Sequence, residues 1–373
     1  MMMTRRDGLR LMAASGVLLA TPVRTLAQDA APSLSALAKA KGMRFGSAVA
    51  GGGGGSWRNP RYAALLEREC AVLVAENEMK WQAIRPTATT FDFDAFDAMI
   101  GYAAQHGLAM RGHNLLWHRP KWMPRWLETH DFGAQPATAA AAMMTTHVET
   151  VCARYKGRIL SYDVVNETVL PEDGMLAQTA LSKAMGGTEP LLDLAFHTAR
   201  HAAPGAELVY NDYMSWEPGN ALHRKGVLKL LEGFRKRGTP VDALGIQSHL
   251  VAPVPAAGER REWQRFIDEV VAMDYRLLIT EFDVRDKDLP ADVALRDRVV
   301  ADTAKAYCET MFGYPQLKDV LAWGMVDAYS WLQGFEPRAD KIEARGGPYG
   351  SDYQPKLLRE ALAAAFLQAP ARS

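Results

Sequence analysis

The chain has 373 residues, of which 48% are hydrophobic and 23% are charged. This composition is typical of globular proteins that bury a large core, and it excludes disordered and fibrous classes. The length allows two average domains or one large α/β barrel.

The first 27 residues are typical of a twin-arginine export signal. Arg5 and Arg6 precede the apolar stretch Leu11–Ala20, and small residues lead to a cleavage site after Ala27. The stretch is too short to span a bilayer, so we expect a cleaved signal and an exported protein, periplasmic or secreted. Cleavage removes four basic residues and one acidic residue and leaves a net charge of −3, which argues against a nucleic-acid or membrane partner.

Eight apolar runs follow the signal, and their branched and aromatic residues favour β-strands. The predicted strands are Met43–Val49, Ala71–Glu76, Ala109–Asn114, Ile159–Asn166, Glu207–Asn211, Ala243–Ser248, Leu277–Glu281 and Val320–Met325. Stretches with helical spacing separate most of them, and a last one follows the eighth strand. The predicted helices are Tyr62–Glu69, Phe93–Gln105, Thr138–Tyr155, Leu191–Ala203, Ala221–Arg237, Glu262–Met273, Asp292–Met311 and Lys356–Leu367.

This alternation predicts a single (β/α)8 TIM barrel, an α/β fold, over residues 28–373. Parallel strands need helical crossovers, and the composition does not change along the chain. A doubly wound open sheet is the alternative, and it predicts a spaced glycine-rich phosphate loop after the first strand. The run Gly51–Gly55 lacks that spacing, so we interpret it as a flexible loop.

Polar residues stand at the ends of these strands. The carboxyl ends of barrel strands converge on one face, where active sites lie, so these residues are predicted to meet. They are Glu76, Asn77, His113, Asn114, Asn166, Glu167, Asn211, Asp212, Gln247, His249, Glu281 and Asp283. Glu167 and Glu281 end opposing strands and suit glycoside hydrolysis, in which one carboxyl is protonated and the other ionised.

Six motifs resemble glycoside hydrolase family 10, the endo-β-1,4-xylanases, and they occur in the order found in that family. They are AENEMKW (Ala75–Trp81), GHNLLWH (Gly112–His118), YDVVNE (Tyr162–Glu167), GIQSH (Gly245–His249), ITEFD (Ile279–Asp283) and WGMVDAYSW (Trp323–Trp331). The resemblance implies a TIM barrel that cleaves xylan with retention of configuration.

The resemblance also implies roles for single residues. Glu167 would be the general acid/base and Glu281 the nucleophile. Asn166 would bind the sugar 2-hydroxyl, Gln247 and His249 would orient the nucleophile, and Asp283 would tune that network. Hydroxyl-binding residues would be Glu76, Asn77, Lys80 and His113, and sugar-stacking residues would be Trp117, Trp323 and Trp331.

Two further segments are expected to shape or cover the cleft. Where the family often has a polar stretch with Gln after its equivalent of His118, this chain has RPKWMPRW, Arg119–Trp126, so Trp122 and Trp126 are expected to reshape the cleft rim. The long charged loop Leu332–Tyr353 is expected to be a mobile lid. Asn211 and Asp212 are assigned to the barrel rim, Trp81 to packing, and His118 either faces the sugar or supports its loop.

Neutral sugars need hydroxyl-binding groups and aromatic faces, so no metal or cofactor is expected. The predicted partner is xylan or a xylo-oligosaccharide, bound by a monomer. Three cysteines, Cys70, Cys152 and Cys308, are expected to be buried thiols, with one disulfide as the alternative. Two other functions stay open: a retaining cellulase or mannanase on a similar barrel, or a barrel that only binds oligosaccharides.

Overall fold

The computed structural model describes residues 31–372, so the predicted export signal, residues 1–27, lies outside the described residues. The barrel and its helices belong to one compact unit, Ser33–Ser373. Its strands are β1 (Arg44–Val49), β2 (Val72–Ala75), β3 (Ala109–Trp117), β4 (Ile159–Asn166), β5 (Glu207–Asp212), β6 (Ala243–Ile246), β7 (His249–Val251), β8 (Arg276–Arg285) and β9 (Leu317–Ala322).

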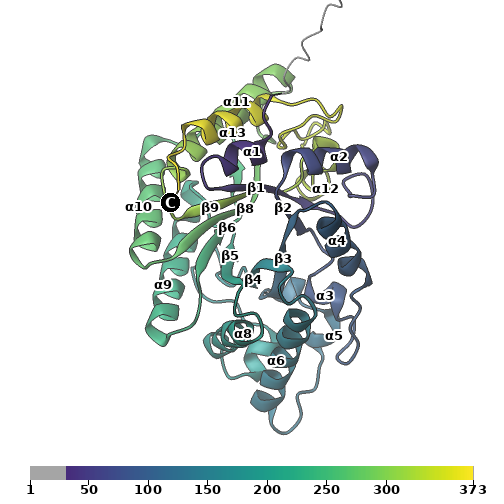
Figure 1. Ribbon diagram of the computed structural model, residues 1–373. Coiled ribbons are helices and arrows are strands. Elements are labelled where there is room, and N and C mark those ends of the chain that lie inside the picture. The colour runs from purple at the N-terminus through teal and green to yellow at the C-terminus, as the bar shows by residue number, and fades with distance from the viewer. Residues whose placement is uncertain (1–30, 373) are drawn as a thin grey trace, which may run out of the picture. The chain divides into compact units, whose positions relative to one another are not determined.

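Eight of these strands close into a parallel barrel, as predicted (Figure 1). Neighbours pair in parallel from β1 to β6, β6 pairs with β8, β8 with β9, and β9 with β1. The short β7 continues the path of β6 and pairs with the outer end of β8. Since no edge is left open, every barrel strand finds two partners, and the open-sheet alternative is wrong.

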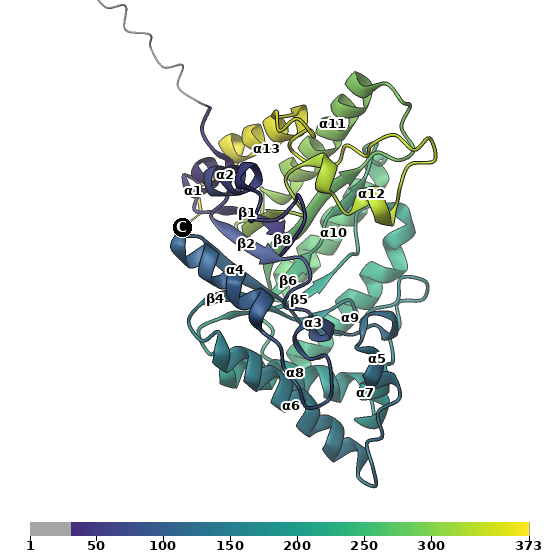
Figure 2. The ribbon, with the colours of Figure 1, turned by 90° about the vertical axis from the view of Figure 1, so that its right-hand side faces the viewer.

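Helices cover the outside of the barrel, and each predicted helix is present (Figures 1 and 2). The covering helices are α2 (Pro60–Glu69), α4 (Asp94–Gln105), α6 (Pro136–Arg154), α8 (Thr188–Ala202), α9 (Ala221–Arg237), α10 (Ala257–Ala272), α11 (Val293–Met311) and α13 (Leu357–Gln368). Shorter helices are α1 (Leu34–Lys39), α3 (Trp81–Ile84), α5 (Arg125–Glu128), α7 (Ala180–Ala184) and α12 (Leu332–Phe335), with 3-10 turns at Pro120–Trp122, Pro218–Asn220 and Asp327–Tyr329. None of the helices in the described part of the chain combines the length and apolar character that crossing a bilayer requires.

Strand ends differ from the prediction where the backbone turns away. β6 stops at Ile246 because Ser248 has φ 62°, and the left-handed conformation breaks an extended run. β9 likewise ends at Ala322, before Gly324 with φ 96°. β3 and β8 instead extend by several residues past their predicted ends, because both keep pairing with neighbours at the rim.

Side chains fill the barrel interior rather than leaving a channel. One interior cluster joins Ala48, Val72, Val74, Leu321 and Trp323, and a second joins Val209, Ala243 and Leu278. A larger core lies between the sheet and its helices. The interior is therefore packed, and ligands can reach only its open end.

The glycine run after β1 has a packing role, so its interpretation as a freely flexible loop is incomplete. A Cβ built on Gly54 would lie 2.0 Å from the ring of Tyr329, and one on Gly55 would lie 2.9 Å from the Tyr329 Cβ. Asn59 donates a hydrogen bond to the Gly54 carbonyl at 3.0 Å. Glycine is needed here because the aromatic ring lies directly against the backbone.

All three cysteines are free and buried, as expected. Burial raises the pKa of each thiol, for Cys152 to about 12, so none of them has the thiolate character of a reactive cysteine.

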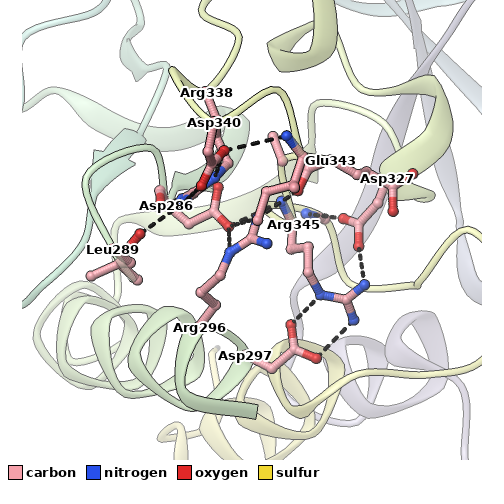
Figure 3. A network of polar contacts seen from close by, with 12 residues as sticks. Asp286, Leu289, Arg296, Asp297, Asp327, Arg338, Asp340, Glu343 and Arg345 are labelled. Carbon is pink, nitrogen blue, oxygen red and sulfur yellow. Dashed lines mark hydrogen bonds and ion pairs between the residues drawn. The ribbon is translucent and has the colours of Figure 1, made fainter. Parts of the chain in front are cut away.

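The loop after β9 is anchored by an ion-pair network, which argues against the mobile lid (Figure 3). Arg338 donates to the carbonyl of Leu289 at 2.7 Å and to Asp340 at 2.7 Å. Arg345 forms two hydrogen bonds of 2.8 Å with Asp297 on α11. The loop is thereby fixed to α11 and to the segment that follows β8.

A buried ion pair lies at the centre of this network. Arg296 on α11 donates to Asp286 at 2.7 Å, and each side chain is 1% exposed. Arg296 also donates to the carbonyl of Glu343 in the loop at 2.5 Å. Removing Arg296 would leave the Asp286 carboxylate buried without its main partner.

We therefore expect Arg296→Met to lower the free energy of unfolding by about 3–5 kcal/mol, because an uncompensated buried charge is costly. Denaturant unfolding followed by circular dichroism measures this change. Arg298→Met is the matched control, since Arg298 is exposed on the same helix. Equal losses for the two variants would contradict a stabilising role for the network.

Candidate active site

A cleft of about 820 Å³ opens at the carboxyl ends of the barrel strands. Its lining includes every residue to which the family resemblance assigned a catalytic, orienting or sugar-binding role, except Asp283. The lining residues are Glu76, Asn77, Lys80, Gln82, His113, Trp117, Arg119, Pro120, Lys121, Trp122, Asn166, Glu167, Pro171, Glu172, Tyr213, Gln247, His249, Glu281, Arg285, Trp323, Trp331, Phe335 and Glu336. The strand ends thus bring these distant segments together, as barrel geometry requires.

Glu281 on β8 is held by donors on both carboxylate oxygens. The Asn211 side-chain amide donates to Oε1 at 2.8 Å, and Nε2 of His249 lies 3.4 Å from Oε2. His249 is itself oriented, because its Nδ1 lies 3.0 Å from Asp283. Asp283 also accepts a hydrogen bond of 2.6 Å from the indole of Trp331. Asp283 therefore lies behind His249 and outside the cleft lining.

These contacts keep Glu281 ionised. Burial acts to raise its pKa, but the His249 hydrogen bond and the charges of His113 and His249 outweigh burial, so the pKa is lowered. Burial likewise acts to lower the pKa of His249, yet the neighbouring Asp283 and Glu281 raise it to about 9. A protonated imidazole beside the carboxylate stabilises the anionic form of Glu281.

Glu167 has a different environment at the tip of β4. Its backbone φ is 53°, in the left-handed region that non-glycine residues rarely adopt, and such strained positions cluster at functional sites. Oε1 accepts hydrogen bonds from Gln247 at 2.8 Å and Asn166 at 3.1 Å. Burial raises the pKa of Glu167 despite the Gln247 contact, and the charges of Asp212 and Glu281 raise it further.

The two carboxyls share one polar chain but have opposite pKa shifts. The Asn211 amide donates to Glu281 and also to the side-chain oxygen Oδ1 of Asn166 at 2.8 Å. The Asn166 amide in turn donates to Glu167. A pair of acids whose environments separate their pKa values can act as proton donor and as anion at the same pH. This arrangement can therefore supply a proton and a nucleophile to one substrate.

The network differs from the sequence prediction at two amides. The Gln247 side chain donates to Glu167 and not to Glu281, the acid that it was predicted to orient. Asn211, assigned to the rim, makes that contact instead, and Thr280 orients it with a 2.6 Å hydrogen bond. The alternation of side chains along β5 could have identified this role of Asn211 from the sequence. Successive residues of a strand face opposite sides, so Asn211 faces the barrel interior as Val209 does.

Asp212 remains at the rim, as predicted. It accepts hydrogen bonds from the Tyr210 hydroxyl and from the Tyr213 backbone at 2.8 Å. His223 lies 3.0 Å away on α9. The Asp212 side chain is fully buried and does not line the cleft.

Asn211→Ala is expected to lower kcat/KM by about 10- to 100-fold, because a hydrogen bond to a charged group is lost. The pKa of Glu281 should rise without this donor, so the acidic limb of the pH profile moves to higher pH. Kinetics across the pH range measure both changes. Asn220→Ala, at the start of α9, is the control. An unmoved acidic limb would contradict the role assigned to Asn211.

Polar residues following β2 form one part of the cleft. Lys80 donates to Asn77 at 3.0 Å, and burial lowers its pKa. Burial and the charge of Glu78 raise the pKa of Glu76 to about 7, while Lys80 acts in the opposite direction. Together these groups offer both donors and acceptors, which suits sugar hydroxyls.

His113 is positioned from inside the barrel. Its Nδ1 lies 2.9 Å from Asp163, whose other oxygen accepts from Arg111 at 2.5 Å. Arg111 also donates to Ser161 at 2.8 Å, and all three supporting side chains are fully buried. This chain fixes the imidazole against the cleft, with one ring nitrogen left for a ligand.

Aromatic rings form the apolar surfaces of the cleft. Trp117 stacks on Trp122 with centroids 4.7 Å apart, and Trp331 contacts His249 at 4.7 Å. Trp323 meets His113 edge to face at 5.4 Å. Tyr213 and Phe335 also line the cleft, although neither was predicted from the sequence. They follow strand ends without a local motif that distinguishes them from core aromatics.

Three other predicted residues lie outside the cleft. Trp126 donates to the carbonyl of Arg85 at 3.1 Å, so its expected place at the rim is wrong. His118 is fully buried between Thr168 at 2.8 Å and Thr179 at 3.2 Å, and it therefore supports its loop. Trp81 stacks on the buried His147 at 3.9 Å, which confirms its packing role.

Within residues 31–372, no group of three or more histidine, cysteine or acidic side chains has the arrangement of a metal site.

Residues 33–365 match the family Glycosyl hydrolase family 10. Endo-1,4-beta-xylanase B of Paenibacillus barcinonensis is 30% identical over 280 residues, covering 72% of this chain and 81% of that protein. Endo-1,4-beta-xylanase 2 of Claviceps purpurea is 30% identical over 326 residues, covering 87% of this chain and 91% of that protein. The structure of xylanase 10B from Thermotoga petrophila RKU-1, in complex with xylobiose, has a TM-score of 0.80 and 25% identity, covering 90% of this chain and 97% of that one. This chain belongs to glycosyl hydrolase family 10.

Proposed function

We propose that this protein is an endo-1,4-β-xylanase that cleaves xylan by double displacement with retention of anomeric configuration. The observation that supports it best is the pair of carboxyls in one cleft, with the pKa of Glu167 raised and that of Glu281 lowered. Family membership and the xylanase names of the relatives support the substrate.

In the first step a carboxylate oxygen of Glu281 attacks the anomeric carbon, and the bond to the leaving sugar breaks. Glu167 gives its proton to the departing oxygen. In the second step Glu167 takes a proton from water, the water oxygen bonds to the anomeric carbon, and Glu281 is released. Two inversions at one carbon return the original configuration.

Surrounding residues bind and orient the sugar in this proposal. The Asn166 amide, which donates to Glu167 in the free protein, can donate to the sugar 2-hydroxyl when substrate binds. This contact strengthens as positive charge develops on the ring. His249, placed by Asp283, keeps Glu281 anionic, and Gln247 orients Glu167. The hydroxyl-binding residues remain Glu76, Asn77, Lys80 and His113, and the stacking residues Trp117, Trp323 and Trp331.

The test is NMR of products during hydrolysis of xylan, with carboxymethylcellulose and mannan as comparison substrates. We expect β-anomers to appear first on xylan, and slower hydrolysis of the other polymers. First products with the α configuration would refute double displacement. Faster cleavage of carboxymethylcellulose or mannan than of xylan would refute xylan as the preferred substrate. Binding without cleavage of any polymer would refute the proposed enzyme activity.

Export remains a proposal from the sequence alone. We propose that residues 1–27 direct twin-arginine export and that cleavage leaves residues 28–373 as the catalytic domain. Arg5→Lys together with Arg6→Lys should retain the protein in the cytoplasm. Mass spectrometry of the exported protein should give a chain that begins at Gln28.

A further inference from the structure

One part of the cleft rim carries positive charge that the proposed chemistry does not use. The segment Arg119–Trp122 follows β3, and Arg119 and Lys121 both line the cleft. This segment is also where the sequence departs from the polar stretch common in the family. Neutral sugars require no cation at a cleft rim, so these two charges need another explanation.

The other cations of the cleft already have partners. Arg285 lies 3.2 Å from the Glu336 carboxylate, and Lys80 donates to Asn77. Within the described part of the chain, neither Arg119 nor Lys121 has a carboxylate within ion-pair distance. Both charges are therefore available to a ligand.

Arg119 is held in place by neutral groups. Its Nη2 donates to the Val169 carbonyl at 3.0 Å and to the Tyr213 hydroxyl at 2.5 Å. These contacts connect the segments after β3, β4 and β5 on the Glu167 side of the cleft. Nε and Nη1 donate to no other described residue, so each of these two nitrogens of a pre-oriented guanidinium can still donate a hydrogen bond to a ligand. A carboxylate oxygen can accept such a charge-assisted hydrogen bond, which is shorter and stronger than one between neutral groups.

Lys121 adds a second, more exposed charge. Its Nζ lies 4.6 Å from the ring centre of Trp122, which stacks on Trp117. Besides Glu167, the acidic residue of the lining on this side without an ion pair among the described residues is Glu172, after β4. Its charge weakens the attraction of this rim for anions.

We propose that Arg119 and Lys121 form a subsite for the carboxylate of a uronic acid branch on the xylan chain. The inference rests on the proposed function and adds to it a preference for acidic polymer. Arg119 supplies a charge-assisted hydrogen bond from Nε or Nη1, and Lys121 supplies longer-range attraction. The branch lies along the rim while the backbone occupies the cleft.

The test compares glucuronoxylan with the same polymer after its carboxyl groups have been reduced to primary alcohols. Branch size is then matched, and only the charge differs. The measured quantity is the ratio of kcat/KM on the acidic polymer to kcat/KM on the reduced one. We expect a ratio above one for the unmodified protein, and a smaller ratio as salt is raised.

Arg119→Gln should lower that ratio by about tenfold, the lower end of the loss expected for a hydrogen bond to a charged group. Lys121→Gln should lower it about twofold, because an exposed charge contributes less. Glu172→Gln should raise the ratio, which tests the idea without removing a positive charge. Arg125→Gln is the matched control, since Arg125 at the start of α5 is exposed and does not line the cleft.

A ratio of one or less, with the reduced polymer still cleaved, would overturn the acidic subsite and leave the proposed function intact. Equal ratios for Arg119→Gln and Arg125→Gln would also overturn it. Failure to cleave either polymer would instead refute the proposed function, and the subsite with it. Arg119→Lys, which keeps the charge, should retain part of the preference.

Discussion

Replacing Glu281 by alanine is expected to reduce kcat on xylan by about 10⁵-fold, because removing a nucleophile typically removes most of the rate enhancement. Binding of xylo-oligosaccharides should persist, since Glu281 is one of many residues that line the cleft. Steady-state kinetics and calorimetric titration measure the two quantities. Substrate that still binds but is not cleaved would separate a chemical defect from a folding defect.

Chemical rescue makes this prediction specific. Azide can enter the space left by the carboxylate and attack the anomeric carbon of an aryl xyloside with a good leaving group. A single displacement gives an α-xylosyl azide, with configuration opposite to the normal product. Glu232→Ala, on the exposed face of α9, is the control and should behave as the unmodified protein. Activity of Glu281→Ala near the normal level would contradict the assignment.

Glu167→Ala is expected to slow hydrolysis of unactivated xylan by about 10³-fold, the usual contribution of general acid catalysis. An aryl xyloside whose phenol leaves without a proton should be slowed in its first step by less than about tenfold. Burst kinetics separate this first step from hydrolysis of the glycosyl enzyme in the second step. Equal effects on both substrates would contradict a proton-donating role for Glu167.

The pH profile tests the same residue independently. Glu167 must hold a proton, so kcat/KM should fall as pH rises through its raised pKa. Glu281 must be ionised, so kcat/KM should also fall as pH drops through its lowered pKa. Glu167→Ala should lose the alkaline limb that Glu167 causes and keep the acidic limb.

Glu76 provides the control for that profile, because burial and Glu78 raise its pKa to about 7 and it could also titrate on the alkaline side. Glu76→Gln should weaken substrate binding yet keep an alkaline limb. If the limb disappears in Glu76→Gln and persists in Glu167→Ala, the proton donor has been assigned to the wrong residue.

Much of the fold could be predicted because local patterns and barrel closure agree. Apolar runs such as Ile159–Asn166 match β4 to the residue, and Ala221–Arg237 matches α9. Predicted strand ends were wrong where the backbone conformation of one residue ended a strand, as at Ser248 after β6. They were also wrong where pairing with a neighbouring strand continued past the apolar run, as in β8. Such endings depend on neighbouring strands, so hydrophobic periodicity does not report them.

Much of the polar lining of the cleft followed from the sequence alone, whereas Tyr213 and Phe335 did not. Strands that end in Asn166, Glu167 and Glu281 must present those groups at one end, because the carboxyl ends of a closed parallel barrel converge. Tertiary structure decided which amide holds which acid: Asn211 reaches Glu281, and Gln247 reaches Glu167. It also decided the opposite pKa directions, since burial and the distances between charged groups arise only when segments far apart in the chain pack together.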